Sequence, residues 1–127
     1  MAETQTCVAR GGGHAQAAAI DTHIREHCTR EDLRRRDVSR HFGLSGRHLS
    51  RLLQLSYGMP FSGRLRHHRV ERAKELLKAD GVCVKEVAAA VGLRSYARLD
   101  EAFLAAEGMS PTQWRQQAAA RGEGQEP

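Results

Sequence analysis

Arginine and lysine side chains are concentrated in the middle of this 127-residue sequence. Residues 32–78 hold twelve of them against four acidic side chains, a local charge of +8, whereas the whole chain carries +5. Clustered cationic groups can hold a polyanion such as nucleic acid against one part of a protein surface. The alternative is a solvated basic face without a partner, which charge alone does not exclude.

Histidine and cysteine side chains could support metal or redox chemistry. His23, His27 and Cys28 have the spacing i, i+4, i+5, which would place three metal-ligating groups on one helical face. We interpret them as packing at the edge of a core, because no fourth ligand is well placed. Cys83 could be a redox-sensitive thiol, but we predict a buried, unreactive one. The sequence thus predicts no metal and no cofactor.

Composition and motifs narrow the class of protein further. Three cysteines without a Cys-x-x-Cys pair argue against a disulfide framework or a structural zinc site. No apolar run approaches the roughly 18 residues of a membrane span, and no signal-peptide pattern is present, so we expect a cytoplasmic protein. A glycine-rich phosphate loop, a nucleophile elbow and a recognisable carboxylate pair are all missing, which indicates that the chain is not an enzyme.

The elements that position these side chains are predicted to be helices. Only six residues are aromatic, which disfavours a β-sandwich, and apolar residues recur with helical spacing. We predict an all-α fold of about seven helices, beginning near residues 17, 32, 45, 60, 84, 95 and 111. Asp32, Ser45 and Ser95 are the predicted N-caps. Residues 1–16 are predicted to be a disordered leader and residues 118–127 a disordered tail.

Two stretches of the sequence form a weak internal repeat. Val38-x3-Phe42-Gly43-Leu44 parallels Val87-x3-Val91-Gly92-Leu93, and each is followed by a helix with a polar outer face. A short helix, a glycine-containing turn and a second helix are typical of a helix-turn-helix. The glycine supplies a left-handed turn, which costs other residues about 1–2 kcal/mol. We predict helix-turn-helix subdomains at residues 17–59 and 81–117, joined by a linker helix at residues 60–80.

Over about residues 18–116 the sequence resembles the DNA-binding unit of the AraC/XylS family of bacterial transcription regulators. The resemblance is carried by GLSGRHLSRLLQLSYGMPFSGRLRHHRVERAKELL, VKEVAAAVGL and FLAAEGMSPTQWR. Its most specific pieces are the late Gly-x-Ser-Pro-x2-Trp-Arg and the run formed by Arg69, Ala73, Leu76 and Leu77. Since a sensing domain does not fit in this length, the chain is most similar to the short MarA/SoxS-like members. Met1 and the leader weigh mildly against a fragment of a longer regulator.

The resemblance implies two homeodomain-like helix-turn-helix subdomains whose recognition helices, about 45–53 and 95–104, enter adjacent major-groove segments of double-stranded DNA. It implies a nucleoid-associated monomer on DNA that recruits or repositions RNA polymerase. Arg47 and Arg51 would each contact a guanine, whereas Arg36 and Arg40 would contact phosphates. The full set of expected DNA contacts is Arg36, Arg40, Ser45, Arg47, His48, Ser50, Arg51, Arg94, Ser95, Tyr96 and Arg98.

The sequence departs from the family pattern in two places. Asp100 and Glu101 stand on outward positions of the second recognition helix, where carboxylates would repel phosphates. We therefore expect asymmetric binding in which the first subdomain dominates. An alternative is an AraC-like interaction module, an anti-regulator or polymerase adaptor, whose second helix binds no DNA. The other departure is Arg34-Arg35, where the family tends to have a serine cap and a buried leucine. Asp32 would cap that helix instead, with Leu33 facing inward; the alternative is an irregular turn.

Overall fold

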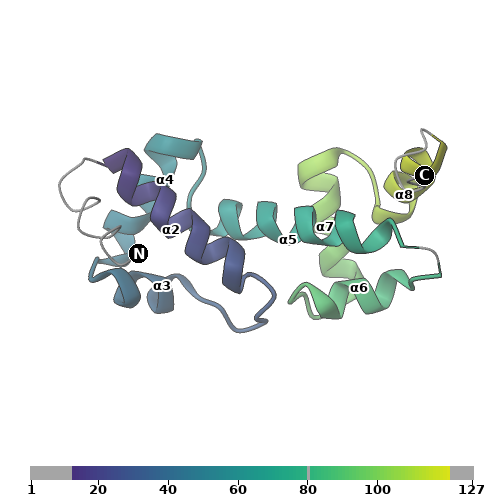
Figure 1. Cartoon of the computed structure of the whole chain (residues 1–127), viewed down its shortest axis with the longest axis horizontal. Coiled ribbons are helices and arrows are strands. Elements are labelled where there is room, and N and C mark those ends of the chain that lie inside the picture. Colours follow the sequence, from purple (N-terminus) through teal and green to yellow (C-terminus); the bar gives the residue numbers. More distant parts are fainter. Residues whose placement is uncertain (1–12, 80, 121–127) are drawn as a thin grey trace. The chain divides into compact units, whose positions relative to one another are not determined.

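The computed structural model describes residues 13–79 and 81–120 of the chain. In this part of the chain every regular element is an α-helix, as expected (Figure 1). None of these helices is both long enough and apolar enough to cross a membrane. In chain order the seven helices are α2 (Gly13–His27), α3 (Arg35–Phe42), α4 (Gly46–Tyr57), α5 (Phe61–Leu77), α6 (Val84–Ala90), α7 (Tyr96–Glu107) and α8 (Pro111–Ala120).

Helix α2 begins earlier and α8 ends later than the sequence pattern predicts. Residues 13–16, expected to be part of the leader, form the first turn of α2, and residues 118–120, expected in the tail, close α8. Residues 118–120 are all alanine, the residue with the highest helix propensity, and residues 13–16 lead directly into the alanines at 17–19. Ala17 and Ala118 are also buried, so packing holds these ends. The rest of the predicted leader and tail, residues 1–12 and 121–127, lies outside the described residues.

The predicted N-cap at Asp32 is wrong. Helix α3 begins at Arg35, and the extended N-cap residue is Arg34. The Asp37 carboxylate accepts a hydrogen bond from the backbone N–H of Arg34 at 3.1 Å. A carboxylate in the first turn is favourable because the amino end of a helix carries partial positive charge. Leu33 is buried, as expected, and its packing fixes the chain just before the helix.

The chain divides into two compact units. The first contains α2, α3, α4 and the start of α5, up to Leu65. The second contains α5 from Arg66 onward, α6, α7, α8 and the short segment Cys28–Glu31. The linker helix is therefore shared, because each unit buries one part of it. Each unit holds one of the two predicted helix-turn-helix pairs, α3–α4 or α6–α7.

In the first unit α2 packs against α3 and α4 (Figure 1). An ion pair fixes α5 to this unit: Arg64 donates two hydrogen bonds to the Asp21 carboxylate, at 2.7 and 2.9 Å. The guanidinium also lies over the Tyr57 ring, 4.3 Å from its centroid. Burial and the charge of Asp21 raise the pKa of Tyr57. The fully or largely buried apolar side chains are Ala17, Ile20, Ile24, Leu33, Val38, Leu49, Leu52, Leu53, Phe61 and Leu65.

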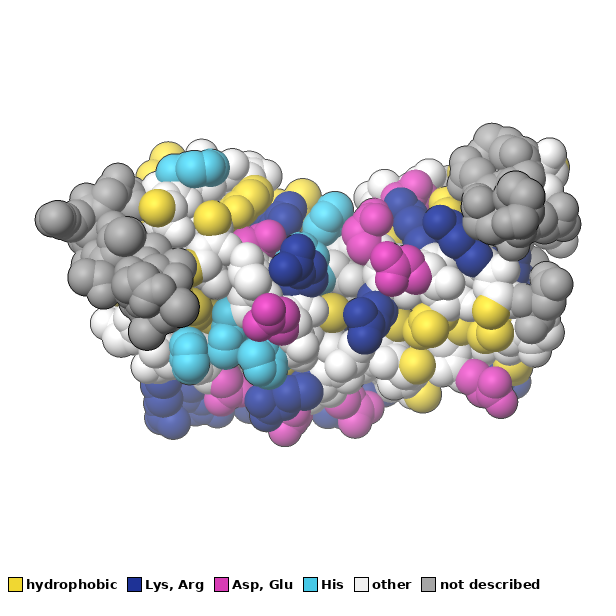
Figure 2. Space-filling model, in the orientation of Figure 1, with side chains coloured by type: hydrophobic (Ala, Val, Ile, Leu, Met, Phe, Trp, Pro, Cys, Tyr) yellow, Lys and Arg dark blue, Asp and Glu magenta, His cyan; other side chains and the backbone are white. Residues whose placement is uncertain are grey.

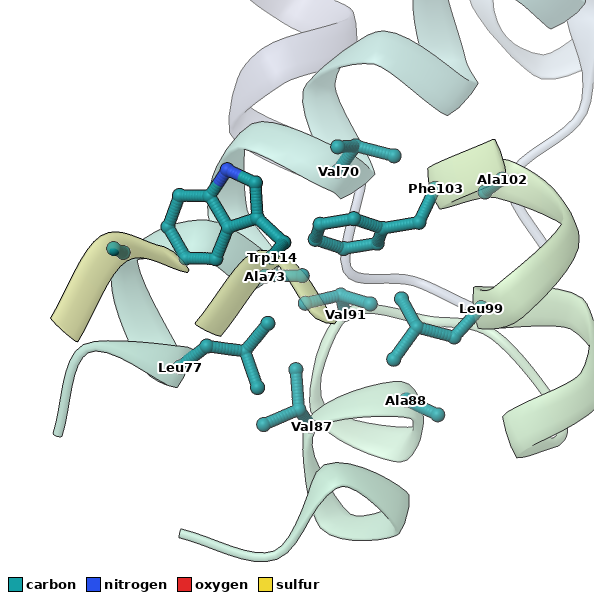
Figure 3. Packing of buried hydrophobic residues seen from close by; sticks show 11 residues of the cluster. Val70, Ala73, Leu77, Val87, Ala88, Val91, Leu99, Ala102, Phe103 and Trp114 are labelled. Carbon is teal, nitrogen blue, oxygen red and sulfur yellow. The ribbon is translucent and has the colours of Figure 1, made fainter. Parts of the chain in front are cut away.

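In the second unit α5, α6, α7 and α8 surround one apolar cluster (Figure 3). Phe103 of α7 and Trp114 of α8 meet edge to face at its centre, with ring centroids 6.1 Å apart. Lys74 of α5 bonds Glu107 of α7 at 2.6 Å beside this core. Sequence periodicity also predicts a buried Leu76, which is half-buried at the edge of the cluster.

The segment Cys28–Glu31 is fixed to α5 by one arginine. Arg69 donates hydrogen bonds of 2.8 Å to the backbone carbonyls of Cys28 and Arg30. Burial lowers the pKa of Arg69, and burial raises the pKa of the Cys28 thiol. Gly92 lies against the same segment, since a Cβ added there would be 2.8 Å from the Thr29 carbonyl oxygen. Arg69, which belongs to one of the most specific motifs shared with the family, therefore holds the Cys28–Glu31 backbone against α5.

Candidate nucleic-acid interface

Helix α4 separates its apolar and polar residues onto two faces. Leu49, Leu52 and Leu53 are buried against the first unit's core, whereas Arg47 and Arg51 are exposed. The predicted N-cap is confirmed, because the Ser45 side chain accepts the backbone N–H of His48 at 3.0 Å. The helix runs on to Tyr57, beyond the predicted end at residue 53, and stops at Gly58 with φ 74°. His48 is exposed and Ser50 is half-buried.

The preceding helix, α3, contributes further positive charge. Its two predicted phosphate contacts, Arg36 and Arg40, are both exposed, and so are Arg34 and Arg35. Val38 and Ser39 face the interior, and the Ser39 hydroxyl donates to the Arg36 carbonyl at 3.1 Å. Figure 2 shows Lys and Arg side chains gathered along the lower edge of the first unit, beside histidines. Two adjacent helices of this unit therefore present arginines to solvent.

Arg35 belongs to this surface, although the sequence analysis did not place it among the expected DNA contacts. It stands at the start of α3, yet its guanidinium Nη1 donates to the Ser50 hydroxyl of α4 at 3.3 Å. It also lies against the backbone of Gly46, where an added Cβ would be 2.8 Å from the Arg35 Nε. In the sequence this position is a departure from the family pattern. The run of three arginines at 34–36, ten residues before α4, is the sequence feature that points to this surface.

Helix α7 has the same frame as α4 but a different outer surface. Ser95 is its N-cap, as predicted, and accepts the backbone N–H of Arg98 at 3.3 Å. Arg98 and Glu101 are exposed, while Asp100 and Tyr96 are half-buried. Arg94, just before the helix, lies 3.5 Å from the Glu31 carboxylate, with 74% of its own side chain exposed. Positive and negative side chains therefore offset each other along this helix.

The histidines of α2 take part in ring stacking. His23 stacks on His27 with centroids 4.2 Å apart and on His41 of α3 at 4.4 Å. The His27 ring also bonds the carbonyl of His23 at 2.8 Å. Within residues 13–79 and 81–120, no three His, Cys, Asp or Glu side chains are arranged to hold a metal ion. These stacked rings form a packed aromatic cluster in the first unit.

The prediction of a buried thiol at Cys83 is wrong. Cys83 is exposed because it is the N-cap of α6, where the chain leaves the loop after α5. Cys28, in contrast, is buried. The sequence pattern placed Cys83 at the start of a helix correctly, but it did not show which way the loop turns the side chain.

The comparisons with known proteins agree with this architecture. A family model described as a helix-turn-helix domain matches residues 38–117. The chain is 34% identical over 96 residues to the HTH-type transcriptional regulator YfiF of Bacillus subtilis. That match covers 76% of this chain but 30% of YfiF, so the chain spans less than a third of that relative's length.

Two solved structures share both fold and sequence with the chain. The C-terminal domain of AraT, a response regulator from Geobacillus stearothermophilus, is 30% identical with a TM-score of 0.73, over 80% of this chain and 84% of that one. The DNA-binding domain of the global transcriptional factor AdpA, solved with a target DNA, is 27% identical with a TM-score of 0.73, over 83% and 94%. Family and fold are those of DNA-binding transcription factors and not of enzymes. The chain belongs to the AraC/XylS family of helix-turn-helix DNA-binding domains.

Proposed function

We propose that this chain is a sequence-specific, double-stranded DNA-binding regulator of transcription that reads DNA chiefly through α4. The observation that carries this proposal is the outer face of α4, where Arg47, His48 and Arg51 are exposed on a helix anchored by three buried leucines. A helix held in this way can enter the major groove as a rigid body. The DNA-bound AdpA domain, with the same fold, supports this proposal.

The side chains of α4 divide between reading bases and holding phosphates. Arg47 and Arg51 each present two parallel N–H donors, which match the O6 and N7 acceptors of guanine. Arg36 and Arg40 of α3, together with the amino end of α4 at Ser45, contact phosphates and set the register without reading sequence. His48 and Ser50 complete the base-reading set.

The second helix-turn-helix contributes less. Arg94, Ser95, Tyr96 and Arg98 form its DNA-facing group, at the amino end of α7. The exposed Glu101 repels phosphates, and the Glu31 carboxylate competes with DNA for Arg94. A carboxylate remains useful only toward cytosine N4. Binding is therefore asymmetric, with a strong half-site for α4 and a degenerate one for α7.

The remaining parts of this proposal rest on the family. One copy of the chain binds DNA as a monomer, through both of its helix-turn-helix units. The bound protein recruits or repositions RNA polymerase in the cytoplasm, at the nucleoid. The relative YfiF, described as a transcriptional regulator, is a longer protein, so these statements concern the DNA-binding part of such a regulator.

Selection from a random duplex pool, followed by titration of the selected site at several salt concentrations, tests the proposal. We expect enrichment of an asymmetric site and a steep linear fall of log affinity with log salt, at roughly 0.9 per phosphate contact. A site covering two segments about 10 bp apart means that both recognition helices engage DNA. Absence of any enrichment, with only weak salt-sensitive binding, contradicts the proposal.

A second candidate function is a protein-interaction module, which the surface of α7 favours. Glu101 and the half-exposed Leu104 stand on α7 outside the core, an acidic and apolar combination better suited to a protein than to DNA. Under this alternative α7 contacts RNA polymerase or another regulator. Reversing the charge of its carboxylates discriminates between the two functions, as described below.

A further inference from the structure

The guanidinium of Arg35 joins the two helices of the first helix-turn-helix. Its Nη1 donates to the Ser50 hydroxyl at 3.3 Å, and its Nε and Cζ lie over the backbone of Gly46. Gly46 and Ser50 are one helical turn apart on α4, so the arginine covers the amino-terminal turn of the recognition helix. Ser50 itself is half-buried, which limits the directions its hydroxyl can face.

The chemistry of this contact restricts what Ser50 can do. A serine hydroxyl has one proton to donate and two lone pairs to accept, whereas a guanidinium can only donate. The hydrogen bond from Arg35 therefore occupies a lone pair of Ser50 Oγ. Among the described residues the structure shows no hydrogen bond donated by the Ser50 hydroxyl. The proton is thus left for a partner outside the protein.

We propose that Arg35 is a positioning residue that makes Ser50 a hydrogen-bond donor toward the DNA. This inference rests on the proposed function. In the major groove the acceptors are purine N7, guanine O6 and thymine O4, while cytosine N4 and adenine N6 are donors. Ser50 then selects an acceptor at one base position, and it does so because Arg35 holds its oxygen.

The contact between Arg35 and Ser50 also depends on Gly46. A Cβ at position 46 would lie 2.8 Å from Nε and 3.2 Å from Cζ of Arg35, so alanine there must displace the guanidinium. Those atoms are the far end of a flexible side chain, and alanine is a better helix former than glycine. Gly46→Ala therefore removes the contact while it keeps the arginine's charge and the fold.

The experiment compares base preference in matched variants of the whole chain. Selection from the same random pool with wild type and with Ser50→Ala identifies the base position that Ser50 reads. At that position the selected base is replaced by an analogue without one acceptor: a 7-deazapurine for purine N7, 2-aminopurine for guanine O6, or 5-methyl-2-pyrimidinone for thymine O4. Affinities for both duplexes are then measured with wild type, Arg35→Met, Arg35→Lys and Gly46→Ala. Arg36→Met, an exposed neighbour on α3, is the control for lost charge.

We expect wild type to prefer the natural base by about tenfold, within the range for a good base contact. Arg35→Met and Gly46→Ala reduce this preference to about threefold or less, and Arg35→Lys, which keeps a donor, restores part of it. Arg36→Met weakens binding to both duplexes equally. In a Ser50→Ala background neither Arg35→Met nor Gly46→Ala changes the preference further. Circular dichroism checks that each variant is folded.

Three outcomes would overturn the inference. If Ser50→Ala leaves the selected site unchanged, Ser50 reads no base. If Arg35→Met behaves like Arg36→Met, Arg35 contributes charge alone. If Gly46→Ala keeps the full preference, the contact seen in the structure does not direct the hydroxyl. Failure of wild type to enrich any site is a different result, because it contradicts the proposed function as well.

Discussion

The two helix-turn-helix units share one frame and differ in the surface that they build on it. Helices α4 and α7 both begin at a serine N-cap, bury a leucine four residues later, Leu49 or Leu99, and end at a left-handed glycine. The exposed residues then diverge. Helix α4 presents arginines and a histidine, whereas α7 presents Arg98 and Glu101. The fold thus constrains caps and core positions and leaves the outer face open to different chemistry.

The turns of the two units also differ in what surrounds them. Gly43 and Gly92 both have positive φ, 70° and 90°, as the left-handed turn requires. Around Gly43 nothing lies within 4 Å of an added Cβ. At Gly92 the carbonyl oxygens of Cys28 and Thr29 would lie 2.9 and 2.8 Å away. The turn of the first unit therefore requires glycine only for its left-handed backbone. The turn of the second unit requires glycine for that backbone and also because a Cβ would not fit.

The largest expected effect comes from breaking this second turn. Gly92→Ala adds a backbone clash to the left-handed strain, and we expect it to cost about 3 kcal/mol of unfolding free energy. Gly43→Ala, the matched control, should cost only the ~1–2 kcal/mol of strain. Urea unfolding followed by circular dichroism measures both. Equal losses would mean that the Cys28–Glu31 segment moves away from Gly92 without penalty.

The next effect concerns the outer faces. Arg47→Ala and Arg51→Ala should each lower affinity for the selected DNA by about 10- to 100-fold and relax the preference at one base pair. Arg94→Ala and Arg98→Ala, at the start of α7, should lower affinity by only about threefold. Titrations on a single duplex at one salt concentration give the comparison. Equal losses in the two units contradict asymmetric binding.

Charge reversal on α7 tests the same asymmetry, and we expect it to change DNA affinity by a smaller factor. If α7 faces DNA, Asp100→Arg with Glu101→Arg should raise affinity by about threefold or more and steepen its salt dependence. Glu75→Arg, at an exposed acid of α5, is the charge control for the single variant Glu101→Arg, because each of these reversals adds two positive charges. Unchanged affinity leaves α7 available for a protein partner and favours the interaction-module function.

The smallest expected effect is a loss of stability at high pH that involves an ion pair of α5. Burial alone would lower the pKa of Lys74, but hydrogen bonds from it to Glu107 and Glu71 outweigh burial, and its pKa is raised above the ordinary 10.5. A raised pKa means stability that is present below pH 10.5 and lost as pH rises through the folded-state value.

We therefore expect the second unit to lose more stability in wild type than in Lys74→Met as the pH rises above 10.5. Trp114, the single tryptophan, lies in the second unit and reports its unfolding by fluorescence. Urea midpoints across this pH range give the measurement, and Tyr57→Phe removes a phenol whose pKa is also raised above its ordinary value. A parallel loss in wild type and Lys74→Met would show that the Glu107 pair adds no pH-dependent stability.

Much of the fold follows from local sequence. Helical periodicity placed seven helices, and Ser45, Ser95, Gly43 and Gly92 marked caps and turns, because capping hydrogen bonds and left-handed backbone depend on single residue types. The predicted N-cap of α3 is wrong because a buried side chain and a competing local hydrogen bond together decide where this helix begins. Asp32 looks like an N-cap, but burial of Leu33 and the Asp37 hydrogen bond move the start of α3 to Arg35.

The amino-acid sequence alone specifies the all-α architecture, the repeat of two helix-turn-helix pairs and the concentration of positive charge in residues 32–78. These properties depend on residue type and spacing along one chain. Long-range packing, in contrast, brings Arg35 to Ser50 across fifteen residues, places Glu31 next to Arg94 and leaves Cys83 exposed. Each of these depends on which helices pack together and how the loops between them turn, and neighbouring residues in the sequence do not specify that.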